Sequence, residues 1–270
     1  MPPLPDALEV ARCSDRLYRT GASHRAGVTI TEVPRGWARL RPGGEHDAFA
    51  STAFNRVHWL TLDAPITRND LIAADTTLRA LDVRRAFLWL SAAGVAGDGD
   101  AELRRLGAER VPFVRYLTLA RPATPATPPK PAPLGARLIP LDELPGTLDA
   151  VSDWYGKDGI PAALSMARAG VSEFHGAFEG ATPVALGALL MDRGARGNGW
   201  GYLGWAGTDP RHRGRGAQSA LIASRVSRAA ELGAAWCISE TNTAVETSLR
   251  NLMRIGFLPA AEWCVYDWRA

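Results

Sequence analysis

The sequence predicts an α/β protein made of two units, each with a β-sheet flanked by helices. Three observations lead to this expectation. Segments with the apolar spacing of strands alternate with segments that have the spacing of helices in both halves of the chain. A proline-rich segment separates the halves. A strand, a glycine-rich basic turn and a helix follow one another between residues 200 and 232.

The length and composition are those of a globular protein. The 270 residues, 46% of them hydrophobic, are enough for two cores, because domains commonly contain about 100–150 residues. No apolar segment approaches the ~20 residues that span a bilayer, and the N-terminus lacks the features of a secretory signal. Cys13, Cys237 and Cys264 are far apart and lack metal-ligand spacing, which favours free buried thiols. We therefore expect a cytoplasmic protein with no metal site and no membrane partner.

The charge pattern does not favour nucleic-acid binding. The formal net charge is only +3, and all but two of the 31 basic residues are arginines. No basic tract with interleaved aromatic residues occurs. We expect no nucleic-acid partner.

The first half reads as alternating strands and helices. Thr67 and Asp70 have the spacing of a capping-box variant, which marks the start of a helix. Pro34 and Gly36 end the first strand. The predicted strands are residues 28–33, 57–62, 86–90 and 111–119, and the predicted helices are residues 8–18, a helix that begins after Thr67, and residues 101–106.

The segment that follows has six prolines in residues 121–133. Proline lacks a backbone N–H, so this segment cannot form a helix or a central strand. We interpret it as an extended, semi-rigid linker. The predicted domains are therefore residues 1–121 and 135–270, joined by residues 122–134.

The second half contains more elements. Residues 172–178 and 183–191 read as an antiparallel pair, with Gly180 at the turn. Gly233 and Gly256 end helices. The other predicted strands are residues 136–139, 200–207, 235–239 and 263–268, and the predicted helices are residues 142–155, 161–168, 217–232 and 245–255.

The basic turn after the strand at 200–207 is the most informative feature of the sequence. A turn of this kind directs unpaired backbone N–H groups outward at the positive end of the following helix. Such a site suits a phosphate or pyrophosphate. Gly214 and Gly216 allow close approach to the ligand because they have no Cβ. Arg211, Arg213 and Arg215 add positive charge.

Two common phosphate motifs do not fit this turn. A P-loop needs Lys-Ser/Thr after its last glycine, where this chain has Ala217 and Gln218. The dinucleotide motif needs a third glycine, which is absent. The pattern Arg-x-x-Gly-x-Gly, formed by Arg211, Gly214 and Gly216, resembles the coenzyme A pyrophosphate loop of GNAT-type N-acetyltransferases.

The resemblance covers residues 135–270. The segment 251–257, which ends in Gly-Phe, is similar to the family's second helix, and segments 240–241 and 248–251 resemble bacterial members with two GNAT-like halves. Residues 20–121 fit a divergent first copy without the glycine-rich turn; an unrelated α/β cap is the alternative. The resemblance implies tandem GNAT-like domains with a central mixed sheet flanked by helices.

The resemblance also implies acetyl-CoA as the cofactor. The acyl-pantetheine arm is expected between two strands that separate beside the turn, and the backbone of residues 213–218 is expected to hold the pyrophosphate. Arg250 or Arg254 is a further possible phosphate contact. The residues expected to bind the cofactor are Thr208, Arg211, Arg213, Gly214, Arg215, Gly216, Ala217, Gln218 and Asn251.

Acetyl transfer to an amine requires a base, because the free amine is the nucleophile. We favour Glu240 at the end of a buried strand; its alternative role is an interaction with the start of the last helix. Glu173 and His175, two apart on one strand face, are the other candidates. Many family members carry a tyrosine acid where this chain has Leu252. The sequence leaves Ser248, Tyr202 and Tyr266 as substitutes, and we include Ser248 among the catalytic residues.

The predicted function is transfer of an acetyl group from coenzyme A to a primary amine of a small molecule or peptide by direct attack. A non-catalytic acyl-CoA-binding or regulatory protein is the alternative. A third hypothesis is O-acyl transfer, or aminoacyl transfer from a charged tRNA. The absence of a continuous row of basic residues in the sequence argues against it. The chain is expected to be a monomer or a homodimer, since the first half can take the place of a second subunit.

Overall fold

The computed structural model describes residues 4–24, 28–33, 35–40, 55–59, 64–92, 94–126, 134–192 and 199–269. These residues form one 11-stranded mixed sheet with helices packed on it, which confirms the predicted α/β class. Residues 60–62 of one predicted strand and residues 127–133 of the predicted linker lie outside the described residues.

The first half begins with a helix and continues into the sheet. Thr67 caps its second helix, α3, with the predicted capping box, because Thr67 and Asp70 each bond the other's backbone N–H. The elements are α1 (Ala7–Ala22), β1 (Thr29–Val33), β2 (Gly36–Leu40), β3 (Arg56–Trp59), α3 (Arg68–Ala80), β4 (Arg85–Ser91), α4 (Gly99–Arg105) and β5 (Ala108–Pro122).

The second half has the strands expected from its sequence, and its helical segments are more divided than expected. The elements are β6 (Gly135–Ile139), α5 (Leu144–Ala150), α6 (Ser152–Tyr155), η1 (Lys157–Gly159), α7 (Ile160–Arg168), β7 (Ser172–Glu179), β8 (Thr182–Asp192), β9 (Gly199–Thr208), η2 (Pro210–His212), α8 (Ala217–Glu231), β10 (Ala234–Asn242), α9 (Glu246–Arg254) and β11 (Leu258–Arg269).

The same order of elements occurs in both halves. In the first, β1, β2 and β3 pair antiparallel in succession, and α3 connects β3 to its parallel neighbour β4. In the second, β7, β8 and β9 pair antiparallel, and α8 connects β9 to its parallel neighbour β10. A helix and a long strand then end each half, namely α4 with β5 and α9 with β11. This repetition agrees with a tandem arrangement.

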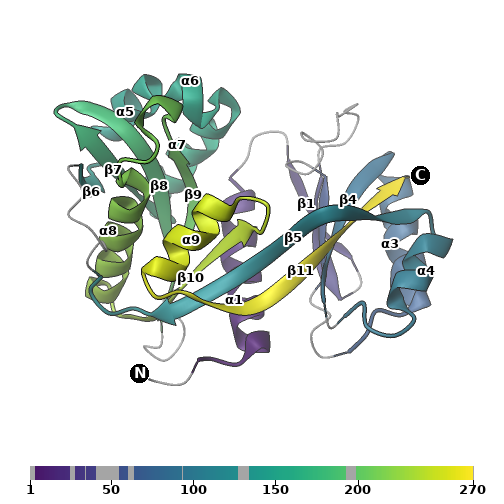
Figure 1. Cartoon of the computed structure of the whole chain (residues 1–270). Coiled ribbons are helices and arrows are strands. Elements are labelled where there is room, and N and C mark those ends of the chain that lie inside the picture. The colour runs from purple at the N-terminus through teal and green to yellow at the C-terminus, as the bar shows by residue number, and fades with distance from the viewer. Residues whose placement is uncertain are drawn as a thin grey trace.

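The two halves exchange their last strands. The strand order is β1-β2-β3-β4-β11-β5-β10-β9-β8-β7-β6, so β11 of the second half pairs with β4 of the first, and β5 of the first half pairs with β10 of the second. Figure 1 shows β5 and β11 running side by side through the middle of the molecule. The sheet is therefore continuous across both halves.

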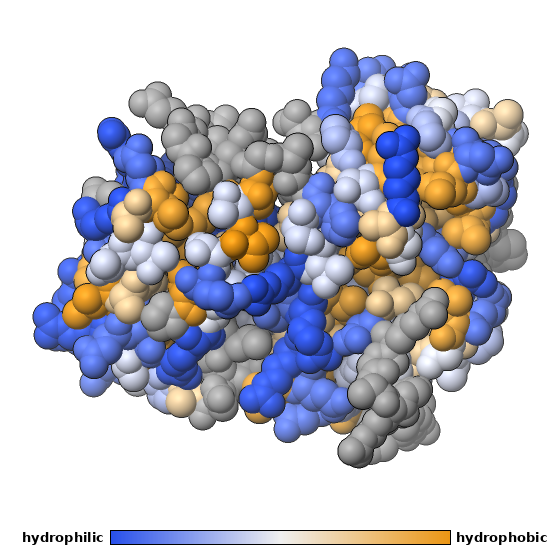
Figure 2. Space-filling view, turned by 180° about the vertical axis from the view of Figure 1, so that it is seen from behind, coloured by the Kyte–Doolittle hydropathy of each residue, from blue (hydrophilic) through white to orange (hydrophobic). Residues whose placement is uncertain are grey.

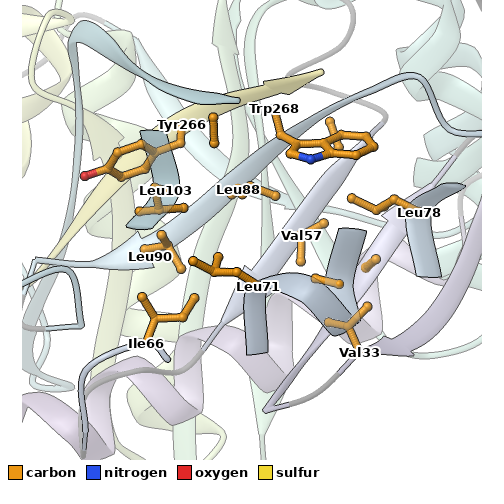
Figure 3. Packing of buried hydrophobic residues seen from close by; sticks show 14 of the residues in the cluster. Val33, Val57, Ile66, Leu71, Leu78, Leu88, Leu90, Leu103, Tyr266 and Trp268 are labelled. Atoms are coloured by element: carbon orange, nitrogen blue, oxygen red, sulfur yellow. The ribbon is translucent and has the colours of Figure 1, made fainter. Parts of the chain in front are cut away.

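Each core consequently contains residues from the other half. Tyr266 and Trp268 of β11 are buried among Leu71, Leu78 and Leu103 of the first half (Figure 3). In the same way, α1 contributes residues to the core beneath β7 to β10, namely Val10, Cys13 and Leu17. The segments 1–121 and 135–270 remain our proposed domains, but neither one contains the whole of a core.

The largest differences from the sequence prediction concern β2, β5, β11 and the helix predicted at residues 142–155. The strand β2 was not expected, because Pro34 and Gly36 read as the end of a strand rather than as part of a hairpin. Both β5 and β11 are longer than predicted, and Pro112 lies where their register shifts, a position that tolerates its missing N–H. The predicted helix at 142–155 is divided at Val151 into α5 and α6.

The three cysteines are free and buried, as predicted. Figure 2 shows apolar and polar side chains interspersed over the face of the molecule opposite to that of Figure 1. In the part of the chain that the structure describes, no helix is long and apolar enough to cross a membrane.

The strand exchange predicts that Trp268→Ala destabilises the protein by about 3–5 kcal/mol, the cost of removing a large buried aromatic side chain. Trp268 is only 2% exposed, and its indole N–H donates to Asp75 of α3. Urea unfolding followed by circular dichroism measures the change. Val245→Ala, at a site that is 52% exposed, is the control. Equal stabilities of the two variants would contradict the assignment of β11 to the first core.

Candidate active site

The strands β9 and β10 pair for only part of their length. Their parallel ladder runs from Gly199 and Ala234 to Tyr202 and Ile238. Beyond it, β9 continues beside β8 as far as Thr208, and β10 continues beside β5 as far as Asn242. Backbone groups of β9 past Tyr202 therefore have no ladder partner on β10.

A β-bulge accompanies this separation. The β8–β9 register shifts between Leu186 and Ala188, and Trp205 has a φ of 53°. Such a bulge bends a strand and redirects its peptide groups. The bulge lies where β9 leaves β10, so it is part of the opening between the two strands.

Three consecutive carbonyl groups at the bulge each accept a hydrogen bond from a different element. Each bond restrains one peptide plane and thereby the direction of the neighbouring N–H. The bonds run from Ser239 Oγ of β10 to Leu203 O (2.8 Å), from Arg225 Nη1 of α8 to Gly204 O (3.2 Å) and from Tyr155 OH of α6 to Trp205 O (2.6 Å).

The turn after β9 leads into an uncapped helix. Gly214 and Gly216 have φ values of 77° and 86°, a backbone conformation that residues with a Cβ rarely adopt. Gly216 is the N-cap of the 15-residue helix α8 and, as a glycine, provides no side-chain cap for the N–H groups of the first turn. The exposed N–H groups and the helix dipole make this end suitable for an anion. Ala217 is buried in a cluster with Ala177, Val184 and Leu221.

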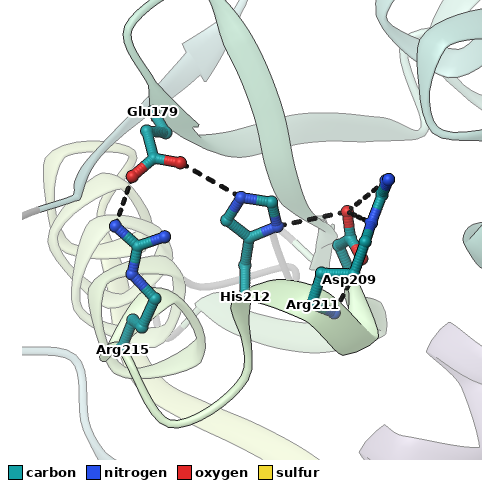
Figure 4. Close-up of polar contacts among 5 residues, drawn as sticks. All are labelled: Glu179, Asp209, Arg211, His212 and Arg215. Atoms are coloured by element: carbon teal, nitrogen blue, oxygen red, sulfur yellow. Dashed lines mark hydrogen bonds and ion pairs between the residues drawn. The ribbon is translucent and has the colours of Figure 1, made fainter.

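Acidic side chains partly neutralise the basic turn (Figure 4). Arg211 pairs with Asp209 at 2.8 Å, Arg215 pairs with Glu179, and His212 lies between the two carboxylates. The Arg211 guanidinium holds the pKa of the Asp209 carboxyl well below its usual range. Asp209 also accepts a hydrogen bond from the backbone N–H of Arg211, which stabilises the turn.

Residues predicted to bind the cofactor meet where α8 begins. Asn251 Nδ2 donates to Gln218 Oε1 at 2.7 Å, and Gln218 Nε2 donates to Ser248 Oγ at 3.3 Å. This polar group joins the last helix, α9, to the uncapped end of α8. Ser248 therefore lies on the α8 side of the sheet.

Glu240 lies on the opposite side. Its side chain points the same way as Ile238, which packs beneath α1, whereas Cys237 packs beneath α8. The structure thus does not bring Glu240 and Ser248 together. The partners of Glu240 are hydroxyl groups: Ser14 Oγ at 2.6 Å, Thr118 Oγ1 at 3.4 Å and Tyr202 OH at 3.5 Å.

Two neighbours of Glu240 have perturbed ionisation. Burial, and to a smaller degree the charge of Glu240, raises the pKa of Asp15 to about 6. The same two causes raise the pKa of Tyr202 well above its usual value. Tyr202 lies at the end of the β9–β10 ladder, so it is both buried and beside the opening.

The other catalytic candidates have structural partners. Glu173 forms a paired interaction with Arg228 of α8 at 2.8 and 2.9 Å. His175 bonds Ser224 at 2.8 Å, and burial lowers its pKa to about 4. Tyr266 donates to Asp100 in the core of the first half. None of these side chains contacts Glu240. Leu252 is buried in the core beneath α8.

Sequence reasoning missed the contribution of α1. Ser14 bonds Glu240 although 226 positions separate them, and Tyr18 follows one turn later on the same helix. Nothing in the amphipathic pattern of residues 8–18 distinguishes these side chains from ordinary helix positions. In the described part of the chain, no group of His, Cys, Asp or Glu is arranged to hold a metal ion.

The fold matches known structures over its whole length. A GCN5-related N-acetyltransferase from Kribbella flavida superposes with a TM-score of 0.65 and 19% identity, covering 99% of this chain and 97% of that one. A tandem GNAT protein from the clavulanic acid biosynthesis pathway, solved without AcCoA, gives a TM-score of 0.63 at 13% identity, covering 97% and 93%.

A third structure agrees with these two. A GCN5-related N-acetyltransferase from Sphaerobacter thermophilus gives a TM-score of 0.56 at 15% identity, covering 87% of this chain and 76% of that one. The sequence matches no protein-family model and no curated protein sequence. The chain therefore has the fold of GNAT acetyltransferases, with two GNAT-like halves. The structure comparisons thus confirm the predicted fold and the predicted resemblance to this family.

The Asp15 environment yields a pH prediction. Its pKa is about 6 in the folded protein against 3.8 ordinarily, so between these values the folded state binds the proton more tightly. Stability is then lost as the pH rises through this range. Relative to Asp15→Asn, the free energy of unfolding of the wild type should fall by on the order of 3 kcal/mol from about pH 4 to pH 7. Urea denaturation at each pH measures this change. If the free energies of unfolding of the two proteins changed equally with pH, Asp15 would not be a buried group that binds a proton in this range.

Proposed function

We propose that the protein is an acetyl-CoA-dependent N-acetyltransferase that acts on a primary amine. The observation that carries this proposal is the separation of β9 from β10 beside an uncapped helix N-terminus preceded by two glycines with positive φ. The strand opening offers backbone groups to an extended acyl-pantetheine arm. The helix end offers N–H groups to its pyrophosphate.

The residues around the helix end support this use. Gly214 and Gly216 leave room for close backbone approach, and the N–H groups of residues 213–218 are proposed to hold the pyrophosphate. Arg213 adds positive charge, while Arg211 and Arg215 retain donors beside their acidic partners. Thr208, Gln218 and Asn251 are proposed to contact the arm, with Ser248 beside them on the same side.

The proposed chemistry divides between the two faces of the sheet. Glu240 accepts a proton from the acceptor ammonium, directly or through water, and the free amine attacks the thioester carbonyl. The carbonyl oxygen meets N–H groups of the β9 bulge, whose peptide planes Ser239, Arg225 and Tyr155 restrain. The C–N bond forms, the C–S bond breaks, and the products are the acetylated amine, the thiol of coenzyme A and one proton.

A specific observation also supports the non-catalytic alternative. Leu252 is buried where many family members carry a tyrosine acid, and Ser248 bonds Gln218 rather than approaching Glu240. A protein that binds acyl-CoA without turnover would show the same cofactor site. Thiol release separates the two functions.

Gly216→Asp should weaken acetyl-CoA binding by more than ~100-fold, because it adds a carboxylate to the anion site and a Cβ where φ is positive. Isothermal titration calorimetry measures this change. Gly233→Asp is the matched control, since Gly233 has a φ of 84° at the opposite end of the same helix. Similar affinities for the two variants would exclude α8 as the pyrophosphate site.

Glu240→Gln should preserve acetyl-CoA affinity and lower kcat by ~10²–10⁴-fold, the usual contribution of a general base. Thiol release with an excess of amine measures kcat, and calorimetry measures affinity. Glu173→Gln, on the other face of the sheet, is the comparison variant. Wild-type kcat in Glu240→Gln would reject this residue as the base.

A further inference from the structure

Within the described residues, the junction of the two halves contains a buried cation that forms no ion pair with a carboxylate. Arg56 of β3 is 6% exposed, and its Nη1 donates to Tyr18 OH at 2.7 Å. Its guanidinium also packs over the rings of Trp89 and Tyr116. In the described part of the chain, none of its partners is a carboxylate, and its buried Nε has no hydrogen-bond partner. A buried charge is costly unless it is paired.

Among the described residues, two carboxylates in the same region form no ion pair with an arginine, although the charges of Arg19 and Arg56 act on Asp15 from farther away. Asp15 accepts from Trp37 Nε1 at 2.8 Å, and its other neighbour is His58 Nδ1 at 3.8 Å. Burial lowers the pKa of His58 far below its usual value, so this imidazole is neutral. In the described part of the chain, the hydrogen bonds to Glu240 come from hydroxyl groups. The hydrogen bonds to both carboxylates therefore come from neutral donors.

These opposite charges belong to one cluster. Burial has the largest effect on the pKa of Asp15, and the charges of Glu240 and Arg56 also influence it. The same two charges influence the pKa values of Tyr202 and Tyr116. Tyr18 links the two sides, since its hydroxyl bonds Arg56 and its helix, α1, carries Ser14 and Asp15. Asp15, Tyr18, Tyr116 and Glu240 are half-buried, so solvent reaches the cluster.

A buried cation and two carboxylates that form no ion pair with arginine among the described residues are together complementary to a zwitterion. We propose that the acyl acceptor is an amino acid, whose carboxylate binds Arg56 and whose ammonium lies at Glu240 and Asp15. This inference rests on the proposed function, because it assigns the acceptor of that same site. The ammonium proton passes to Glu240, and the reaction is the balanced acetyl transfer described above.

Other acceptors satisfy the cluster less well. A simple amine neutralises the carboxylates and leaves Arg56 unpaired. A peptide has an amide group next to its α-amine where an amino acid has its carboxylate. A peptide therefore also leaves Arg56 without an anionic partner. A site built to pair with a polar group discriminates strongly against ligands that lack it, because its own buried group is then left unsatisfied.

The first test compares matched acceptors by thiol release from acetyl-CoA. Glycine, L-leucine, L-glutamate and L-phenylalanine are each compared with the corresponding α-amide. The amide has the less basic amine and hence more free base, so without recognition of the carboxylate it reacts faster. We expect kcat/KM for at least one amino acid to exceed that of its amide by about 100-fold.

The second test changes Arg56. Arg56→Gln should lower the ratio of kcat/KM for the preferred amino acid to that for its amide by about 100-fold, mainly through a higher KM. Arg56→Lys should retain part of the preference because it retains the charge. Tyr18→Phe provides an independent variant that keeps the ring and removes the hydroxyl that accepts hydrogen bonds from Arg56 and Arg39. Arg85→Gln, on β4 and paired with Asp267, is the control for loss of an arginine.

The outcomes separate this inference from the proposed function. Failure to bind acetyl-CoA in calorimetry overturns both. Binding with turnover of amides or simple amines, and no preference for any of the four amino acids, overturns the zwitterion assignment alone. Binding without turnover of any acceptor tested also overturns it. A preference that survives in both Arg56→Gln and Tyr18→Phe shows that the carboxylate is recognised elsewhere.

Discussion

The exchange of β5 and β11 is the constraint on which the rest of the structure depends. Each strand completes the sheet of the other half, so both halves share one continuous sheet and one set of neighbours. Because β5 borders β10, Thr118 of the first half lies beside Glu240 of the second. The candidate active site is therefore a product of both halves, although only the second contains the glycine-rich turn.

The sheet also separates two groups of candidate site residues. The uncapped end of α8, with Gln218, Ser248 and Asn251, lies on one face, and Glu240 with α1 lies on the other. The opening between β9 and β10 begins beside Tyr202, whose hydroxyl bonds Glu240. Under the proposed function, an extended ligand in this opening would present its phosphate end to α8 and its reactive end to Glu240. The two predicted catalytic residues do not meet because they lie on opposite faces of the sheet.

Local sequence predicted the elements that depend on local physics. The capping box at Thr67, the apolar faces of α8 and the glycine-terminated helices follow from hydrogen-bonding and spacing rules that act within a few residues. Prediction failed where distant pairing overrides those rules. Pro112 is tolerated within β5 because a register shift lies there, and β2 forms because it pairs on both sides with β1 and β3.

By itself, the sequence determined the α/β class, the order of the strands and helices in the second half, and the basic glycine-rich turn with its likeness to a coenzyme A loop. Each of these features depends on residues that are close together in the sequence. Tertiary structure alone decided that α1 lies against Glu240, that Tyr266 belongs to the first core, and that Arg56, Asp15 and Glu240 form one cluster. Burial and pairing between residues up to 226 positions apart create these relationships, and no local periodicity encodes them.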